Sequence, residues 1–189
     1  MRLREDIRTV LPNLHTNRYK TIYADPPWAK ETGGGVICRG AQKHYDVMKQ
    51  ADLITLSLQI RRITAPAAHL YLWVTNNCLL DGIELCDAWG FKYKTLITWA
   101  KDRIGIGQYF RGQTEQCIFA TKGMLPFKIV NGKRQQGSTL ITAPRLRHSQ
   151  KPVQMREYIE RVSYGPRLEL FARRCPRRWD AIGLELEDV

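Results

Sequence analysis

The sequence predicts an α/β domain built on a mainly parallel central sheet. Short apolar segments rich in β-branched and aromatic residues alternate along the chain with segments whose apolar residues recur at helical spacing. Residues 67–75 (AAHLYLWVT) are almost continuously apolar, which is typical of a strand buried on both faces in a parallel sheet. The 189 residues are enough for one such domain, and we expect a single domain over 1–189.

The first strand is expected over 21–24, because the two prolines that follow cannot extend a hydrogen-bonded ladder. Residues 50–64 carry leucine and isoleucine at helical spacing and predict a helix. After the strand at 67–75, a second helix is expected over 79–90, ending at Gly90.

The second half of the chain continues the alternation. Residues 91–101 and 115–123 predict two strands, and residues 151–164 predict an amphipathic helix with a proline in its first turn. Residues 167–174 and 179–186 predict a last pair of strands. Ligands of such sheets bind beyond the carboxyl ends of the strands, so the residues that follow each strand are the first candidates for function.

Three segments are rich in Gly, Lys and Arg and have weak periodicity: 29–47, 102–114 and 125–148. We expect them to be surface loops that bind substrate, because binding residues are concentrated on such loops. The net charge of +12 favours a polyanionic partner, most simply nucleic acid, although a basic protein without such a partner is an equally open interpretation.

The five cysteines lie far apart in the sequence, and no two have the spacing of a zinc site, so no metal and no disulfide framework is expected. No apolar run is long enough to cross a bilayer, and the charged N-terminal residues lack the apolar core of a signal peptide. We therefore expect a cytoplasmic protein without a membrane partner.

The sequence Asp25-Pro26-Pro27-Trp28 follows the first predicted strand. Neither proline can donate a backbone hydrogen bond, so the segment offers a carboxylate and carbonyl oxygens as acceptors on a stiff backbone beside an indole ring. This set suits a planar ligand that carries an amino group. The alternative is an ordinary turn after a strand, which is what a bare Asp-Pro-Pro most often forms.

Three motifs in order, D-P-P-W at 25–28, S-x-K-P at 149–152 and E-L-F-A-R at 169–173, resemble those of the MT-A family of adenine-N6 methyltransferases. The resemblance extends over nearly the whole chain. It implies a Rossmann-like, S-adenosyl-L-methionine-dependent methyltransferase fold. The motif order is similar to the permuted arrangement of the β-class amino-methyltransferases.

The resemblance implies that Asp25, Pro26, Pro27 and Trp28 are the catalytic residues. Asp25 and the carbonyl of Pro26 would accept hydrogen bonds from the target amine, and Trp28 would stack on the base. Asp25 would also lie near the methionine end of the cofactor.

The resemblance further implies a cofactor site made of Asp25, Ser149, Lys151, Glu169, Phe171, Arg173 and Glu185. Lys151 would pair with the methionine carboxylate and Glu185 would bind the ribose hydroxyls, while Glu169 has a less defined place in the pocket. Lys151 and the two glutamates could instead be ordinary surface residues. The chain departs from the mRNA-type members, which carry an asparagine-glutamine pair near 184–185.

The candidate nucleic-acid-binding residues are the basic and aromatic side chains Lys43, His44, Tyr45, Tyr109, Arg111, Lys133 and Arg134. Each one alone is as well explained as solvated surface, but together they indicate a binding face. Because the target amine is paired inside a duplex, the enzyme must extrude the base or act on single strands.

The function expected is methylation of the N6 amino group of adenine in DNA, by a bacterial or phage enzyme that is a monomer or homodimer. Three alternatives remain open. They are the same reaction on RNA, methylation of the cytosine amino group, and a catalytically silent nucleic-acid-binding subunit.

Overall fold

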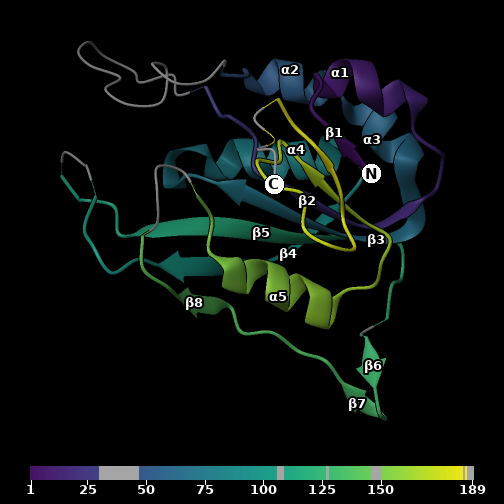
Figure 1. The fold of residues 1–189 in the computed structure, drawn as a ribbon. Helices are drawn as coiled ribbons and strands as arrows, with labels where there is room; N and C mark the ends of the chain where they lie inside the picture. The colour runs from purple at the N-terminus through teal and green to yellow at the C-terminus, as the bar shows by residue number, and fades with distance from the viewer. Residues whose placement is uncertain (30–46, 106–108, 127, 146–149, 185, 187–189) are drawn as a thin grey trace.

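The computed structural model describes residues 1–29, 47–105, 109–126, 128–145, 150–184 and 186. An eight-stranded sheet in the order β1-β10-β9-β2-β3-β5-β4-β8 forms its centre, and β6 and β7 form a separate hairpin (Figure 1). The strands are β1 Arg2–Leu3, β2 Tyr19–Ala24, β3 Thr64–Val74, β4 Lys92–Ala100, β5 Thr114–Lys122, β6 Ile129–Val130, β7 Lys133–Arg134, β8 Leu140–Thr142, β9 Arg167–Leu170 and β10 Asp180–Ile182. The helices are α1 Ile7–Val10, α2 Gln50–Thr55, α3 Ser57–Ile63, α4 Leu79–Ala88 and α5 Val153–Val162, with 3-10 turns η1 Leu11–Asn13 and η2 Asn76–Cys78.

The sheet confirms the predicted α/β class with mainly parallel strands. Every neighbouring pair in it is parallel except the two pairs that β5 forms, with β3 and with β4. In the described part of the connection between β4 and β5, residues 101–105 and 109–113 form no helix. A strand that returns without a crossover helix pairs antiparallel with the strand before it, which explains why β5 alone is reversed.

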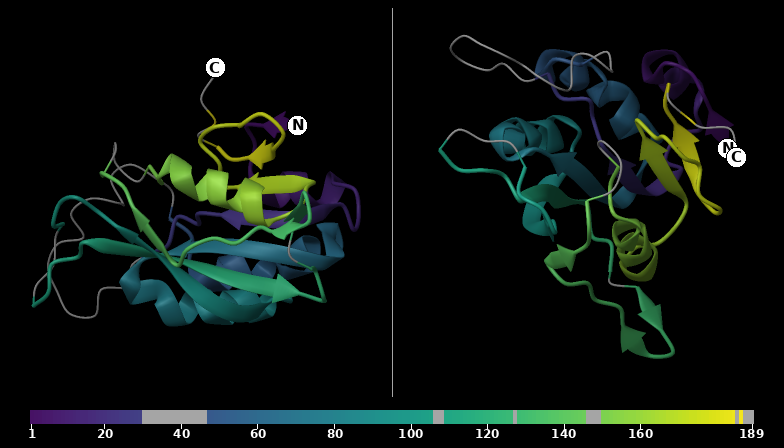
Figure 2. Two further views of the ribbon diagram at one scale, coloured as in Figure 1. Left: turned by 90° about the horizontal axis from the view of Figure 1, so that it is seen from below. Right: turned by 60° about the vertical axis from the view of Figure 1, so that its left-hand side comes forward.

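The helices cover the sheet on two sides (Figure 2). Successive side chains of a strand point to opposite faces, so β2 and β3 contribute to two apolar clusters. Ile22 and Leu72 belong to the cluster that also holds the buried residues of α1 to α4. Tyr23 and Trp73 belong to the cluster formed with α5, whose Met155 is fully buried.

The helix predicted over 50–64 is divided at Leu56. The amide of Leu56 donates to Leu53 O at 3.3 Å, which tightens this turn, and the hydroxyls of Thr55 and Ser57 donate to nearby carbonyls of the same segment. Hydroxyl side chains that bind local carbonyls compete with the regular helical ladder, and the axis changes here from α2 to α3.

The segment predicted as a loop over 125–148 contains three short strands. β6 and β7 form a hairpin whose turn residues Asn131 and Gly132 have φ of 49° and 73°, the left-handed conformation that two-residue hairpin turns require. β8 adds to the edge of the sheet beside β4. Within the residues that the structure describes, no helix is long and apolar enough to cross a membrane.

Candidate active site

The carboxyl ends of β2 and β9 lie side by side where the chain order of the sheet reverses. From β2 the chain crosses over to β3 on one side, and from β9 it goes to β10 on the other. Ala24, the last residue of β2, pairs with Leu72 of β3 and with Leu170 of β9. Asp25 therefore lies at the switch point of the sheet, the place where α/β proteins bind ligands.

The residues after Asp25 are fixed by hydrogen bonds. The amide of Trp28 donates to Pro26 O at 2.9 Å, and the amide of Met48 donates to Pro27 O at 2.8 Å. Trp28 is 8% exposed, and its indole Nε1 donates to Trp73 O at 2.9 Å. The Pro26 carbonyl thus already accepts one bond, with a second lone pair left for a ligand. The expected stacking of Trp28 on a base stays a prediction, because most of its surface is covered.

Four charged side chains join three strand ends at this edge of the sheet. Lys151 Nζ lies 2.8 Å from Asp25 Oδ2 and 3.4 Å from Glu115 Oε2. Lys101 Nζ donates to the other oxygen of Glu115 at 2.6 Å. The side chains are 13% to 28% exposed, so the network opens to solvent only in part. Lys151 also lies over the ring of Trp73, 5.5 Å from its centre.

Positive and negative side chains alternate in this network, and the alternation shifts the pKa of Lys151 and of Glu115. Burial alone would lower the pKa of Lys151, but Asp25 and Glu115 raise it above the ordinary value of a lysine. Burial alone would raise the pKa of Glu115, but Lys151 and Lys101 lower it. At neutral pH Lys151 is therefore cationic, and Glu115 is a carboxylate.

The carboxylate of Glu169 on β9 is paired with an arginine inside the protein. Its oxygens accept two hydrogen bonds from Arg156 of α5, at 2.7 Å and 3.0 Å, and it is 6% exposed. Burial raises the pKa of Glu169 in spite of Arg156. The carboxylate that was expected to contribute to the cofactor pocket is thus held by a guanidinium on the α5 face of the sheet, and its contact with a cofactor stays a prediction.

The chain turns sharply directly after β9. Phe171 has φ of 60°, an uncommon conformation for a side chain of its size and one that often marks functional sites. The next residue, Ala172, approaches Gly183 so closely that a Cβ at position 183 would lie 2.2 Å from Ala172 O. Phe171 and Arg173, both half-buried, are therefore held on a defined backbone beside the carboxyl end of β2.

The structure separates the candidate nucleic-acid-binding residues into two places. Tyr109 and Arg111 are exposed on the connection after β4, at the same edge as Asp25. Lys133 and Arg134 belong to the β6–β7 hairpin, which projects near the C-terminal end of α5 (Figure 1). The candidates Ser149, Glu185, Lys43, His44 and Tyr45 lie outside the described residues.

Sequence reasoning assigned no role to Lys101, Glu115 or Arg156. Trp99 pairs with Glu115 in the antiparallel β4–β5 ladder, so Lys101, two residues after Trp99, lies on the same face as Glu115 and diagonally across from it. This pairing could have been found from the two predicted strands once they were aligned as a hairpin. Arg156 carried no comparable signal, because it meets Glu169 through the packing of α5 on the sheet and not through a strand pairing.

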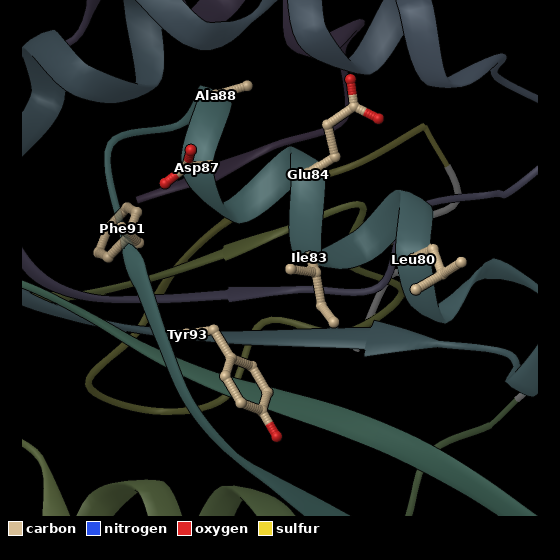
Figure 3. A pocket seen from close by; sticks show the side chains of 7 residues that line it. All are labelled: Leu80, Ile83, Glu84, Asp87, Ala88, Phe91 and Tyr93. Atoms are coloured by element: carbon tan, nitrogen blue, oxygen red, sulfur yellow. The ribbon is translucent and has the colours of Figure 1, made fainter.

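A pocket of about 400 Å³ lies elsewhere, between the outer side of α4 and the first residues of β4 (Figure 3). It is lined by Leu80, Ile83, Glu84, Asp87, Ala88, Phe91 and Tyr93. None of these is a predicted site residue, so the pocket is separate from the site at Asp25. Among the described residues, no cluster of three or more His, Cys, Asp or Glu side chains could hold a metal ion.

A mainly parallel sheet with a charged site at its switch point places the chain among Rossmann-like α/β methyltransferases. Residues 19–185 match the MT-A70 family, and the chain belongs to that family.

Three relatives illustrate its range. The Type II methyltransferase M.MunI of Mycoplasma sp is 32% identical over 197 residues, which cover 95% of this chain and 82% of the relative. The human N(6)-adenosine-methyltransferase catalytic subunit METTL3 is 27% identical over 188 residues, which cover 91% of this chain and 29% of the relative. A putative N(6)-adenosine-methyltransferase MT-A70-like protein of Medicago truncatula is 29% identical, covering 91% of this chain and 27% of the relative. The chain thus spans less than a third of these two eukaryotic relatives.

Proposed function

We propose that this chain is a cytoplasmic, S-adenosyl-L-methionine-dependent methyltransferase that methylates the N6 amino group of adenine in DNA. The observation that carries the proposal is the partly exposed carboxylate of Asp25 at the switch point of the sheet, 2.8 Å from Lys151 Nζ. It lies in the D-P-P-W motif of a chain that belongs to the MT-A70 family.

The residues present fit the cofactor. Lys151 is a cation at the switch point that could bind the methionine carboxylate, and the backbone turn at Phe171 and Arg173 could border the nucleoside part. Asp25 could bind the cationic end of the methionine. S-adenosyl-L-methionine, when bound, supplies a methyl group on a sulfonium, so the reaction needs no metal ion.

The protein's task is to make a weak nucleophile reactive. The lone pair of the adenine amine is delocalised into the ring, and acceptors on its N–H groups favour a pyramidal nitrogen with a more available lone pair. Asp25 and the free lone pair of the Pro26 carbonyl are such acceptors. The positive charge that develops on the nitrogen is stabilised by the carboxylate, so positioning and electrostatics supply the rate gain.

The neighbouring charges set the position of Asp25. Lys151 contacts Asp25 in this structure, and it contacts Glu115 as well. Glu115 therefore offers Lys151 an alternative partner, which leaves Asp25 available to the amine.

One observation favours DNA as the substrate. The net charge of +12 suits a polyanion, whether DNA or RNA. The chain is 32% identical to a type II methyltransferase and 27% identical to human METTL3, so of these two relatives it is more similar to the former. RNA is the second candidate, because the relatives include N(6)-adenosine-methyltransferases.

The test is transfer of labelled methyl groups to DNA by the wild type and by Asp25→Asn, which keeps the size of the side chain and removes its charge. We expect the variant to lose roughly 100- to 1,000-fold in rate, as is typical when a group that stabilises developing charge is removed. Asp87→Asn on α4, exposed and remote from the site, is the matched control and should keep full activity. Full activity of Asp25→Asn would refute the role of this carboxylate.

Further measurements separate the alternatives. Competition between DNA and RNA of matched sequence identifies the preferred nucleic acid, and nucleoside analysis distinguishes methylated adenine from methylated cytosine. Calorimetry that detects no binding of S-adenosyl-L-methionine would favour a catalytically silent subunit.

A further inference from the structure

The connection between β4 and β5 projects from the sheet as a hairpin arm, which we call the β4–β5 arm and define by its described residues 101–105 and 109–113 (Figure 1). Lys101 N donates to Gln113 O at 2.9 Å, and the side-chain amide of Gln113 donates back to Lys101 O at 2.9 Å. Farther out, Gly105 N donates to Gly112 O at 2.7 Å, and Arg111 Nε donates to Gly105 O at 2.9 Å. These bonds extend the β4–β5 ladder and hold the two sides of the arm together.

The arm presents two large aromatic side chains to solvent. Tyr109 is 94% exposed and Phe110 is 93% exposed, beside Ile104 at 53%. Among the described residues, no other aromatic side chain is exposed by more than half. Side chains this exposed contribute nothing to the core, and a Tyr-Phe pair in water indicates a surface that binds a partner.

The base of the arm contacts the charged residues of the candidate active site. Lys101 at its base donates to Glu115, which contacts Lys151, the partner of Asp25. Asp102 accepts a hydrogen bond from Arg145 N at 2.7 Å, which joins the arm to the segment that leads from β8 towards α5. The arm therefore begins within the charged network that contains Asp25, and it projects from the same end of the sheet.

The charges around the aromatic pair indicate what the partner is. Arg103 and Arg111 are exposed on the arm, one on each side, in a chain of net charge +12. An aromatic pair flanked by guanidinium groups fits a nucleic acid, whose bases stack on rings and whose phosphates pair with arginine. An apolar protein surface would not require the arginines.

We propose that Tyr109 and Phe110 insert into the base stack of duplex DNA beside the target adenine, while Arg103 and Arg111 bind the flanking phosphates. This inference rests on the proposed function. It answers a requirement of that function, since an amine paired in a duplex reaches Asp25 only after its base leaves the stack. The inserted ring occupies the space that the extruded base leaves and so favours the open state.

The test compares two substrates of one sequence. The methylated site is first mapped on mixed DNA with the wild type, and a synthetic duplex is then made with the target adenine either paired or opposite an abasic position. On the paired duplex, Phe110→Ala should lose roughly 5- to 150-fold in kcat/KM, the range for one lost stacking contact, and the Tyr109→Ala/Phe110→Ala double variant should lose at least as much. On the abasic duplex, where opening needs little energy, the loss should be less than about threefold.

A second readout follows the base itself. With 2-aminopurine in place of the target adenine, the wild type should increase the fluorescence on binding, and the double variant should do so much less. Met124→Ala is the matched control: Met124 is 94% exposed but follows β5, at the opposite edge of the sheet, and its loss should change neither readout.

The proposal would be overturned if the variants lost equal factors of kcat/KM on both duplexes. It would also be overturned if the double variant increased the fluorescence on binding as much as the wild type does. If the wild type methylates no DNA, the proposed function fails. If the wild type is active and the arm variants methylate the paired duplex as fast as it does, only the inference about the arm fails.

Discussion

The buried pair of Arg156 and Glu169 gives a sharp prediction about stability. The perturbation is Arg156→Met, which keeps much of the volume and removes the charge. In the native protein both oxygens of Glu169 are bound by Arg156, at 2.7 Å and 3.0 Å, and the Glu169 side chain is 8% exposed. The variant leaves that carboxylate buried without its partner.

We expect Arg156→Met to lower the free energy of unfolding by about 3–5 kcal/mol, the range for breaking a buried ion pair at one end. For a domain of this size that corresponds to a decrease in Tm of roughly 6–20 °C. Glu169→Gln should have a smaller effect, about 1–3 kcal/mol, because Arg156 is 24% exposed and can turn its charge to water. The double variant should lose less free energy of unfolding than the sum of the losses in the two single variants.

The loss in Arg156→Met should also depend on pH. Burial already raises the pKa of Glu169, and without Arg156 it rises further. A carboxyl whose pKa is raised by folding stabilises the folded state at low pH, and this contribution is lost as pH increases through the folded pKa. The difference from the wild type should therefore be smaller at about pH 5 than at about pH 8.

Urea denaturation followed by circular dichroism measures these differences. Arg161→Met, which removes an exposed arginine from the same helix, is the matched control and should change stability by less than about 1 kcal/mol. A loss below about 1 kcal/mol in Arg156→Met, or strict additivity in the double variant, would refute the assignment of this pair as a buried, mutually dependent unit.

Three further predictions concern the site and its support. Glu115→Gln should lower kcat/KM in the methylation assay by roughly 10- to 150-fold, which corresponds to about 1.5–3 kcal/mol of transition-state stabilisation. The reason is that Lys101 and Lys151 lose the carboxylate that they share. Gly183→Ala should lower the free energy of unfolding in urea by about 1–3 kcal/mol or more, because the new Cβ would meet backbone atoms. Asp180→Asn should destabilise the protein at neutral pH, with a difference that vanishes in acid, because the pKa of Asp180 is lowered by its partners in the folded state.

The first two of these predictions have matched control variants, and the third has a result that would contradict it. Glu157→Gln, on the exposed side of α5, should keep full methylation activity. Gly137→Ala should be nearly neutral, since the nearest side-chain atom would lie 3.5 Å from the new Cβ. Asp180 binds the N-terminal amine, Arg18 and the hydroxyl of Tyr19, so an acid titration of unfolding that is identical for the wild type and Asp180→Asn would contradict the last prediction.

A strand or helix could be predicted where a single feature of the sequence specified its type or its end. The prolines at 26 and 27 fix the end of β2, and the continuous apolar run identifies β3. The sequence carried a hairpin signal at Asn131-Gly132 that the loop prediction for 125–148 did not use. β8 had no such signal, because three residues are too few to show a periodic pattern, and they become a strand only by pairing with β4, about 40 residues earlier in the chain.

The site was predictable to the same extent. The resemblance implied that Asp25 and Lys151 both lie at the methionine end of the cofactor, and in the structure the two side chains are 2.8 Å apart, while their contacts with a cofactor stay a prediction. The place of Glu169 could not be derived, because which face of β9 it occupies depends on register. Its partner Arg156 is set by the packing of α5 on that face, which no local pattern encodes.

The most direct test of the central claim is mass spectrometry of nucleosides from mixed DNA incubated with S-adenosyl-L-methionine and the purified protein. We expect N6-methyladenine as the methylated nucleoside with the wild type and a background signal with Asp25→Asn. Methylated cytosine in its place, or equal N6-methyladenine from both proteins, would contradict it.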